Sequence, residues 1–260
     1  TEDQTVMRTS LVPGLIEAAV YNIAHQVKNL KLFEIGKTYI KSDRQDLPLE
    51  PEILAALWTG SRNETSWHQG EISCDFYDIK GCVEALIRAL KIDKFRFTKI
   101  PDEACDYTRP GHTAQILIAG LQVGIAGEIH PLVRDNFDLK QTAFIFELEL
   151  DKIMSLIPPP AAARPIPRFP AINRDITIII DRGIETQTVL DAVDDIGENL
   201  VERLHLFDVF EGDPIAAGKK SVSFRVTYRS STKTLEDDDV NDLHRAITDK
   251  LLKAFGATLP

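Results

Sequence analysis

The stretch Ile157-Pro-Pro-Pro-Ala-Ala-Ala-Arg-Pro-Ile-Pro-Arg-Phe-Pro170 decides how the chain is organised. It holds six prolines, at positions 158, 159, 160, 165, 167 and 170. Proline has no N–H to give to a hydrogen-bonded ladder, fixes φ, and keeps the residue before it extended. Such a run is typical of a semi-rigid polyproline spacer. The sequence therefore predicts a domain over residues 1–156, a linker over 157–170 and a second domain over 171–260.

The composition is that of a globular protein, with 43% hydrophobic and 27% charged residues among 260. No apolar run approaches the roughly 20 residues of a membrane span, so we expect a cytoplasmic protein without a membrane partner. The three cysteines are odd in number and lack Cys-x-x-Cys spacing, which predicts reduced thiols rather than a disulfide set or a zinc site. Because the chain starts at Thr1 without an initiator methionine, we expect a fragment of a longer polypeptide.

The net charge of −10 argues against binding of nucleic acid by bulk electrostatics, because that mode normally uses a basic domain. A local basic face stays open as an alternative.

The first half alternates between helical and strand periodicity. A helix is expected from about Leu11, with Pro13 in its first turn, and a second one after Asp78, which can cap it. Strands are predicted at 30–40, 53–59, 94–99, 113–118, 122–128 and 143–150, with a turn at Pro110-Gly111 and a short helix over 131–137. This pattern predicts an α+β domain with a mostly antiparallel sheet.

Glu147 and Glu149 alternate with apolar residues, so both carboxylates would project from one face of a strand. Two interpretations are open: a carboxylate pair that binds a metal or acts in acid–base chemistry, and a solvated strand face, which the sequence favours. His130 precedes Pro131 at a helix start, where a capping role is expected. The chain shows no nucleophile motif, P-loop or zinc signature, so we expect neither catalytic nor metal-binding residues.

The second half predicts the order β-α-β-β-α-β of a ferredoxin-like fold. Strands are expected at 174–181, 204–210, 221–229 and 257–259, with one helix from Thr186 and a long one after Thr234. In the third strand Val222, Phe224, Val226 and Tyr228 would face the helices, and the residues between them would face away.

The charge of this half is uneven. Residues 165–260 hold 12 Lys and Arg against 17 Asp and Glu, yet residues 214–235 hold five bases and no acid. A basic, open sheet face resembles that of other ferredoxin-like RNA binders. The alternative, which the strand alone supports equally, is that these bases keep an open sheet soluble or pair with neighbouring acids.

Several motifs, in order, resemble the beta subunit of bacterial phenylalanyl-tRNA synthetase, and they span essentially the whole chain. In the first half they are Met7-Arg-Thr-Ser-Leu-Val-Pro-Gly-Leu15, Leu32-Phe-Glu-Ile-Gly36, Phe76-Tyr-Asp-Ile-Lys-Gly81 and Gly127-Glu-Ile-His-Pro131. Beyond the linker they are Phe169-Pro-Ala-Ile-Asn-Arg-Asp175, Leu206-Phe-Asp-Val-Phe-Glu-Gly212 and Gly218-Lys-Lys-Ser221.

The resemblance implies a class II synthetase-like antiparallel-sheet domain without catalytic function, followed by a ferredoxin-fold anticodon-binding domain. It implies that the first domain scaffolds the alpha subunit in a heterotetramer of two alpha and two beta subunits. That holoenzyme would use ATP and Mg2+ to charge tRNA(Phe), and the fragment itself would hold no cofactor. The family's editing site would lie in N-terminal domains outside this sequence.

Four positions are expected to have lost the features of a class II ATP site. Ile40 stands where catalytic domains of the family carry a phosphate-binding arginine. Glu147 and Glu149 stand where the catalytic motif has glycines, and Lys152 stands where it has arginine. Carboxylates repel polyphosphate and add bulk where backbone must approach a nucleotide, and lysine lacks the planar fork of arginine. We therefore expect no ATP binding.

The resemblance also favours tRNA as the ligand of the basic sheet. The residues expected to approach anticodon stem-loop phosphates, with Phe207 or Phe210 available for stacking, are Arg174, Lys219, Lys220, Arg225 and Arg229. The alternative function is a free-standing ferredoxin-like interaction or regulatory protein without an RNA role.

Overall fold

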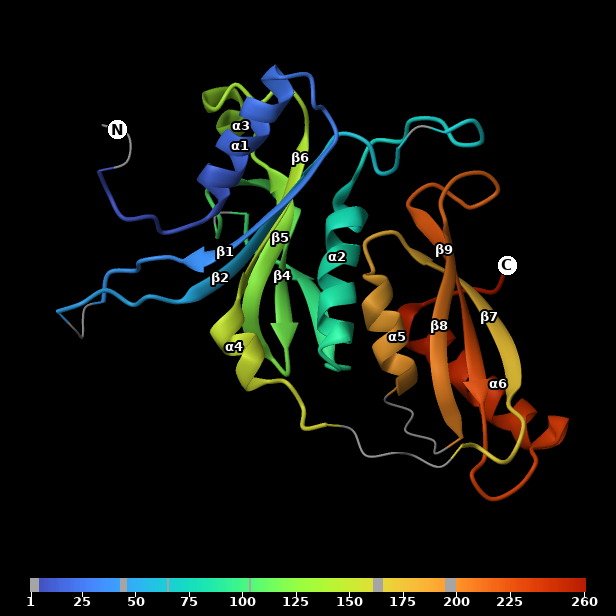
Figure 1. Ribbon diagram of the computed structural model, residues 1–260. Helices are drawn as coiled ribbons and strands as arrows, with labels where there is room; N and C mark the ends of the chain where they lie inside the picture. The colour runs from blue at the N-terminus through green and yellow to red at the C-terminus, as the bar shows by residue number, and fades with distance from the viewer. Residues whose placement is uncertain (1–4, 43–45, 65, 103, 161–165, 195–199) are drawn as a thin grey trace. The chain divides into compact units, whose positions relative to one another are not determined.

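A computed structural model describes residues 5–42, 46–64, 66–102, 104–160, 166–194 and 200–260 (Figure 1). The chain divides into two compact units, Thr1–Ala161 and Ala162–Pro260, which we call the first and the second unit. The expected boundaries at 156/157 and 170/171 stay a prediction, because residues 161–165 of the linker lie outside the described residues. Within the described ranges, no helix is long and apolar enough to cross a membrane.

The first unit is built on a six-stranded antiparallel sheet with the strand order β1-β2-β6-β5-β4-β3 (Figure 1). The strands are β1 Leu30–Lys37, β2 Glu52–Thr59, β3 Phe95–Lys99, β4 Thr108–Ile118, β5 Leu121–Ile129 and β6 Ala143–Glu149. The expected antiparallel α+β architecture is confirmed.

Two helices cover opposite faces of this sheet, α1 (Val12–Ala24) and α2 (Phe76–Ala89) (Figure 1). The central strand β6 serves both faces: Ile145 packs in the cluster of α1, and Phe146 and Leu148 pack in the cluster of α2. This alternation follows from the period of two in a strand. Glu147 has the same parity as Ile145, which places it on the α1 side.

Two short helices complete the first unit. In α3 (Pro131–Asn136) the His130 Nδ1 accepts the N–H of Leu132, which confirms the expected capping role. The helix α4 (Leu150–Ser155) follows β6 directly and includes Lys152. The periodicity of the sequence predicts Leu150 as the last residue of β6, whereas it is the first residue of α4.

The expected cap of α2 is wrong by three residues. The helix begins at Phe76, and Asp75 is its N-cap, accepting the N–H groups of Tyr77 at 2.8 Å and Asp78 at 3.3 Å. Asp78 returns the bond by accepting the N–H of Asp75 at 2.8 Å, which completes a capping box. Both aspartates therefore accept backbone N–H groups at the start of the helix. The sequence alone did not show which of the two is the N-cap.

The second unit has three antiparallel strands in the order β7-β9-β8, where β7 is Ile172–Asp181, β8 is Val201–Phe210 and β9 is Lys219–Tyr228. A bridge between Ile179 and Thr258 adds the last strand position beside β7. With α5 (Thr186–Asp194) and α6 (Asp237–Phe255), this is the expected ferredoxin-like order.

One face of this sheet packs on the helices. The side chains of Val222, Phe224, Val226 and Tyr228 are fully buried, as the alternation predicted, and pack with Val189 of α5 and Ile247 of α6. We call the opposite face of β7, β9 and β8 the open face. On β9 it carries the odd-numbered residues from Lys219 to Thr227.

Candidate functional site

A cavity of about 690 Å³ in the first unit is lined by residues of β2, β5 and β6 and of the segment between β1 and β2, and we call it the sheet cavity. Three of the four positions expected to be degenerate line it: Ile40, Glu147 and Glu149. Lys152 is not among the lining residues, but its Nζ donates to Glu149 Oε1 at 2.6 Å and to the Gln122 carbonyl at 3.2 Å. The structure thus brings the four positions together.

Glu147 is fully engaged by protein donors. Its Oε1 accepts the Ser10 hydroxyl and the Leu11 N–H, each at 2.8 Å, and its Oε2 accepts the Tyr107 hydroxyl at 2.5 Å. Burial, together with the neighbouring charge of Glu147, raises the pKa of Tyr107, so the phenol keeps its proton and donates it. The favoured interpretation of a solvated strand face is wrong for Glu147, which ties the start of α1 and the segment before β4 to β6.

The other carboxylates of the sheet cavity are also engaged. Glu50 pairs with Lys37 at 2.9 Å, Glu149 pairs with Lys152, and Asp151 accepts the N–H of Glu52 at 3.1 Å. Among the described residues that line the cavity there is no lysine or arginine. The lining thus holds four carboxylates, two of them paired with lysines, and offers a polyphosphate no cation of its own.

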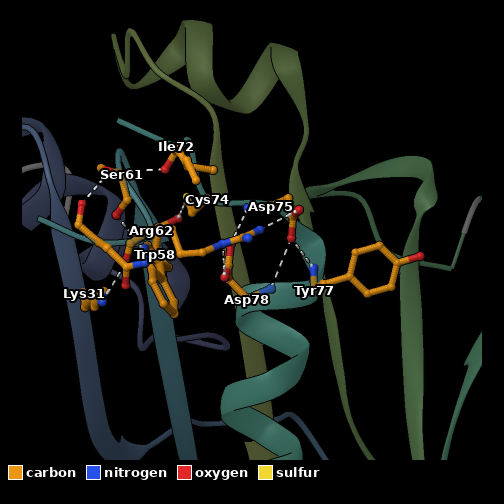
Figure 2. Close-up of polar contacts among 10 residues, drawn as sticks. Lys31, Trp58, Ser61, Arg62, Ile72, Cys74, Asp75, Tyr77 and Asp78 are labelled. Carbon is orange, nitrogen blue, oxygen red and sulfur yellow. Dashed lines mark hydrogen bonds and ion pairs between the residues drawn. The ribbon is translucent and has the colours of Figure 1, made fainter. Parts of the chain in front are cut away.

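Figure 2 shows the polar network at the N-terminus of α2. The guanidinium of Arg62 reaches Asp75 at 2.9 Å and Asp78 at 2.7 Å, the two members of the capping box. The Arg62 carbonyl accepts Lys31 Nζ at 3.1 Å, and this ammonium lies 4.0 Å from the centroid of the Trp58 ring. The network fixes the first turn of α2 to β1 and β2. It uses charged side chains for anchoring rather than for chemistry.

Cys74, next to this network, is a structural thiol. It is buried, donates to the Trp58 carbonyl at 3.8 Å, and has a pKa raised to about 11 by burial. Because the thiolate is the reactive form of cysteine, such a thiol is inert at neutral pH.

On the open face of the second unit, Arg225 makes a two-pronged ion pair. Its Nε and Nη2 reach the two carboxylate oxygens of Asp175 at 2.7 and 2.8 Å, across the register of β7 and β9. These hydrogen bonds lower the pKa of Asp175. The guanidinium carbon also lies 5.7 Å from the centroid of the half-exposed Phe207 ring. An arginine beside an aromatic ring is suited to a phosphate or a stacked base.

Two further expected residues share the open side but are also paired. Lys219 Nζ lies 2.6 Å from Asp181, and Arg229 pairs with Glu202 at 2.9 Å while donating to the Phe169 carbonyl at 2.9 Å. The alternative that these bases pair with neighbouring acids therefore describes the unliganded face. An incoming phosphate has to compete with these carboxylates.

Arg174 and Lys220 do not lie on the open face. Arg174 pairs with Asp237 at the start of α6, on the helix-covered side. Lys220 is only 8% exposed, and burial lowers its pKa. Arg174 and Lys220 are each one residue away from a position of the open face, Asp175 and Lys219. Because side chains alternate along a strand, both lie on the helix-covered face. The structure thus spreads Lys219, Arg225 and Arg229 along β9 and just past its end, and places Arg174 and Lys220 on the other side of the sheet.

The chain was compared with known proteins. Residues 1–150 match the family described as "Phenylalanyl tRNA synthetase beta chain CLM domain", and residues 167–260 match "Ferredoxin-fold anticodon binding domain". The chain belongs to the phenylalanyl-tRNA synthetase beta chain family. This confirms the resemblance found in the sequence, the α+β fold class and the ferredoxin-like second unit. It also disfavours the free-standing regulatory protein.

Curated relatives of this beta chain family align along the whole chain. The phenylalanine–tRNA ligase beta subunit of Geobacter sulfurreducens is 37% identical over 258 residues, which cover 99% of this chain and 32% of the relative. Those of Symbiobacterium thermophilum and Geobacillus kaustophilus are 34% and 36% identical, with coverage of 99% and 100% of this chain and 28% and 32% of the relatives. The chain spans about a third of the length of these relatives.

A pyrrolysyl tRNA synthetase structure, Desulfitobacterium hafniense PylSc, aligns with a TM-score of 0.42 and 15% identity, over 56% of this chain and 48% of its own. This likeness is too low to bear on function.

Proposed function

We propose that this chain is a non-catalytic part of a phenylalanine–tRNA ligase beta subunit. It would support ATP-dependent charging of tRNA(Phe) in the cytoplasm by scaffolding the alpha subunit and by binding the anticodon region. The single observation that carries the proposal is the open face of the second unit, a solvent-facing ferredoxin-like sheet with Arg225 beside Phe207, in a chain of this family.

The residues of the sheet cavity do not fit ATP and Mg2+. The position expected to hold a phosphate is an isoleucine, Ile40, and the nearby lysines 37 and 152 are paired with glutamates. The carboxylate of Glu147 already accepts three hydrogen bonds from the protein, so it is not available as a metal ligand. We derive no catalytic step in this chain, and the nucleotide chemistry would belong to the alpha subunit.

The scaffolding role is supported by exposed apolar side chains on the edge strand β1. Phe33 is 73% exposed and Ile35 is 54% exposed, on a strand paired only with β2 among the described residues. An exposed apolar edge strand marks an interaction site or an aggregation hazard. Contact with the alpha subunit would cover it.

The RNA role is tested by replacing Arg225 and Arg229 with alanine. We expect the variant to bind a labelled tRNA(Phe) anticodon stem-loop more weakly, with a flatter dependence of log K on log salt by about one per arginine. The measurement is fluorescence anisotropy across a salt series. A matched control replaces Lys250 and Lys253, two exposed lysines of α6, with alanine.

The control variant removes the same net charge without touching the open face. If the control and R225A/R229A have the same salt slope, the open face does not bind the stem-loop and the RNA role is refuted. Even in the intact chain we expect weak binding, because Asp175 and Glu202 compete for the two arginines.

A further inference from the structure

The first unit carries a basic surface that the proposed function does not use. Residues 88–99 contain five Lys and Arg and one acid, in a chain with a net charge of −10. With one lysine from the middle of α2 they form what we call the basic edge: Lys80, Arg88, Lys91, Lys94, Arg96 and Lys99.

The basic edge lies where α2 meets β3, the outermost strand of the six-stranded sheet. Lys80 Nζ lies 4.9 Å from the centroid of the Phe97 ring, and the guanidinium carbon of Arg88 lies 5.6 Å from that of Phe95. The two rings are 6.2 Å apart and pack in the core cluster of α2. The charged groups of Lys80 and Arg88 therefore lie over aromatic rings, which favours a cation at this surface.

Two of these cations, Lys91 and Lys94, are less engaged than those of the open face. Arg88 shares Glu84 with Lys80, and Lys99 approaches Asp102 at only 3.9 Å. Lys91 and Lys94 are exposed, and neither forms an ion pair with any residue that the structure describes. By contrast, Arg225, Arg229 and Lys219 each hold a carboxylate within 3 Å.

The helix alone accounts for only part of this charge. A basic residue near a helix C-terminus is favourable, because the carbonyl ends there carry partial negative charge. That explains Arg88 and Lys91, at the end of α2. Lys94 lies beyond the helix, in the segment before β3, and the helix does not account for it. Arg62 and the capping box hold the opposite end of α2, so the helix presents its basic residues from a fixed position.

We propose that the basic edge binds the phosphate backbone of RNA, as a contact separate from the open face of the second unit. The inference rests on the proposed function in taking a tRNA as the RNA. The contact is independent of sequence, because Phe95 and Phe97 are half-buried under the cations and lysines bind phosphate as point charges. An exposed polyanion complements this surface, to which residues 88–99 contribute five bases and one acid.

The test uses the whole chain with Lys91→Glu and Lys94→Glu together. Binding of a full-length tRNA(Phe) transcript, followed by anisotropy in a salt series, should weaken by about ten-fold or more and lose about two units of salt slope. The variant K91Q/K94Q should give a smaller loss of the same kind. The matched control K28E/K250E makes the same change in net charge at exposed lysines elsewhere, and should alter affinity by about two-fold at most.

The isolated anticodon stem-loop separates this contact from the open face. K91E/K94E should bind the stem-loop as the unmodified chain does, and R225A/R229A should lose stem-loop binding. If R225A/R229A has no effect while K91E/K94E weakens full-length tRNA, the proposed function of the open face fails and the basic edge stands.

Three results would overturn the basic edge as an RNA site. The first is an affinity and slope of K91E/K94E equal to those of K28E/K250E. The second is an equal loss on the stem-loop alone, which would mark a general charge effect. The third is loss of binding to vesicles of equal parts phosphatidylcholine and phosphatidylserine with tRNA binding intact, which would assign the surface to a membrane.

Discussion

At the residue scale, Glu147 is the carboxylate of the sheet cavity with the most protein partners. Three donors from two segments converge on it, and Tyr107 is held protonated beside it. A half-buried carboxylate with several donors is stabilised by its hydrogen bonds, and its removal leaves those donors without partners. Glu149, two residues on, holds one lysine of α4.

Glu147→Ala should therefore lower the free energy of unfolding of the first unit by about 1–3 kcal/mol. The matched change Glu149→Ala removes only a half-exposed ion pair and should cost less than about 1 kcal/mol. Urea unfolding followed by tryptophan fluorescence measures both, because Trp58 and Trp67 both lie in the first unit. Equal losses in the two variants would contradict the anchoring role of Glu147.

His244 is a residue of the second unit whose pKa burial perturbs. Its Nδ1 lies 3.0 Å from the hydroxyl of the buried Tyr228, and burial, followed by the charge of Arg174, lowers the pKa of the imidazole. Burial also raises the pKa of Tyr228 to about 12, so the phenol is the donor to a neutral imidazole at neutral pH. Charging His244 would turn Nδ1 into a donor, so Tyr228 could no longer donate to it, and would place a cation near Arg174.

The second unit should consequently lose stability as the pH falls below 6.5, the ordinary pKa of histidine. The unfolded chain takes up a proton there before the folded chain does, so protonation favours unfolding until the lower folded pKa is passed. Hydrogen exchange of β9 amides between pH 8 and pH 5 measures this. In His244→Gln the loss in this window should disappear, and a loss as large as in the unmodified chain would refute the assignment.

The sequence predicted the buried face of β9 correctly, because Val222, Phe224, Val226 and Tyr228 alternate without interruption. The same parity places Lys220 with the buried set, so its position was readable from the sequence. The carboxylates that pair with the bases were not readable, because Asp175 lies 50 residues from Arg225 and meets it only through the strand register. Local periodicity carries no information on which residues of two distant strands lie opposite each other.

At the scale of elements, the start of α2 depends on one capping box and one arginine. Asp75 accepts two helix N–H groups and also holds Arg62, so a single carboxylate links the helix to the segment that follows β2 (Figure 2). N-cap acids contribute more than surface ion pairs because they satisfy donors that the helix leaves free.

Asp75→Ala should lower the stability of the first unit by about 1–2 kcal/mol and speed hydrogen exchange in the first turn of α2. Asp93→Ala is the control, because Asp93 is an exposed acid outside any helix or strand. Urea unfolding by tryptophan fluorescence and peptide-level exchange measure the two effects. An unchanged exchange rate at residues 76–79 would contradict the capping role.

Elements were predicted best where periodicity is long, and worst at irregular ends. The strand expected at 113–118 extends back to Thr108, because a register shift between Thr108 and Thr113 takes Pro110 and Gly111 into β4. Gly111 has φ +74°, a conformation that glycine adopts without strain. The sequence identified the turn residues but not that the ladder resumes beyond them. The cavity was likewise not predictable from the sequence, because its lining comes from three strands and several connecting segments.

At the scale of the whole molecule, each unit has a hydrophobic core of its own. The first unit has one cluster on each side of its sheet, and the second unit has a single cluster between its sheet and two helices. The three clusters share no residue. A unit with its own core can fold by itself.

Residues 166–260 expressed alone should therefore unfold cooperatively, with one thermal transition in far-UV circular dichroism. The matched experiment on residues 1–160 should give the same kind of transition. A featureless, non-cooperative melt of residues 166–260 would mean that the second unit depends on the first for stability.

The proposed function requires that this chain contacts tRNA while its synthetase-like unit leaves ATP to another subunit. The most direct measurement is calorimetric titration of the whole chain, with Mg·ATP and then with a tRNA(Phe) transcript at low salt. We expect no saturable heat from ATP up to millimolar concentration, and saturable heat from tRNA that weakens as salt is added. Micromolar ATP binding, or no tRNA heat above that of buffer, would contradict the claim.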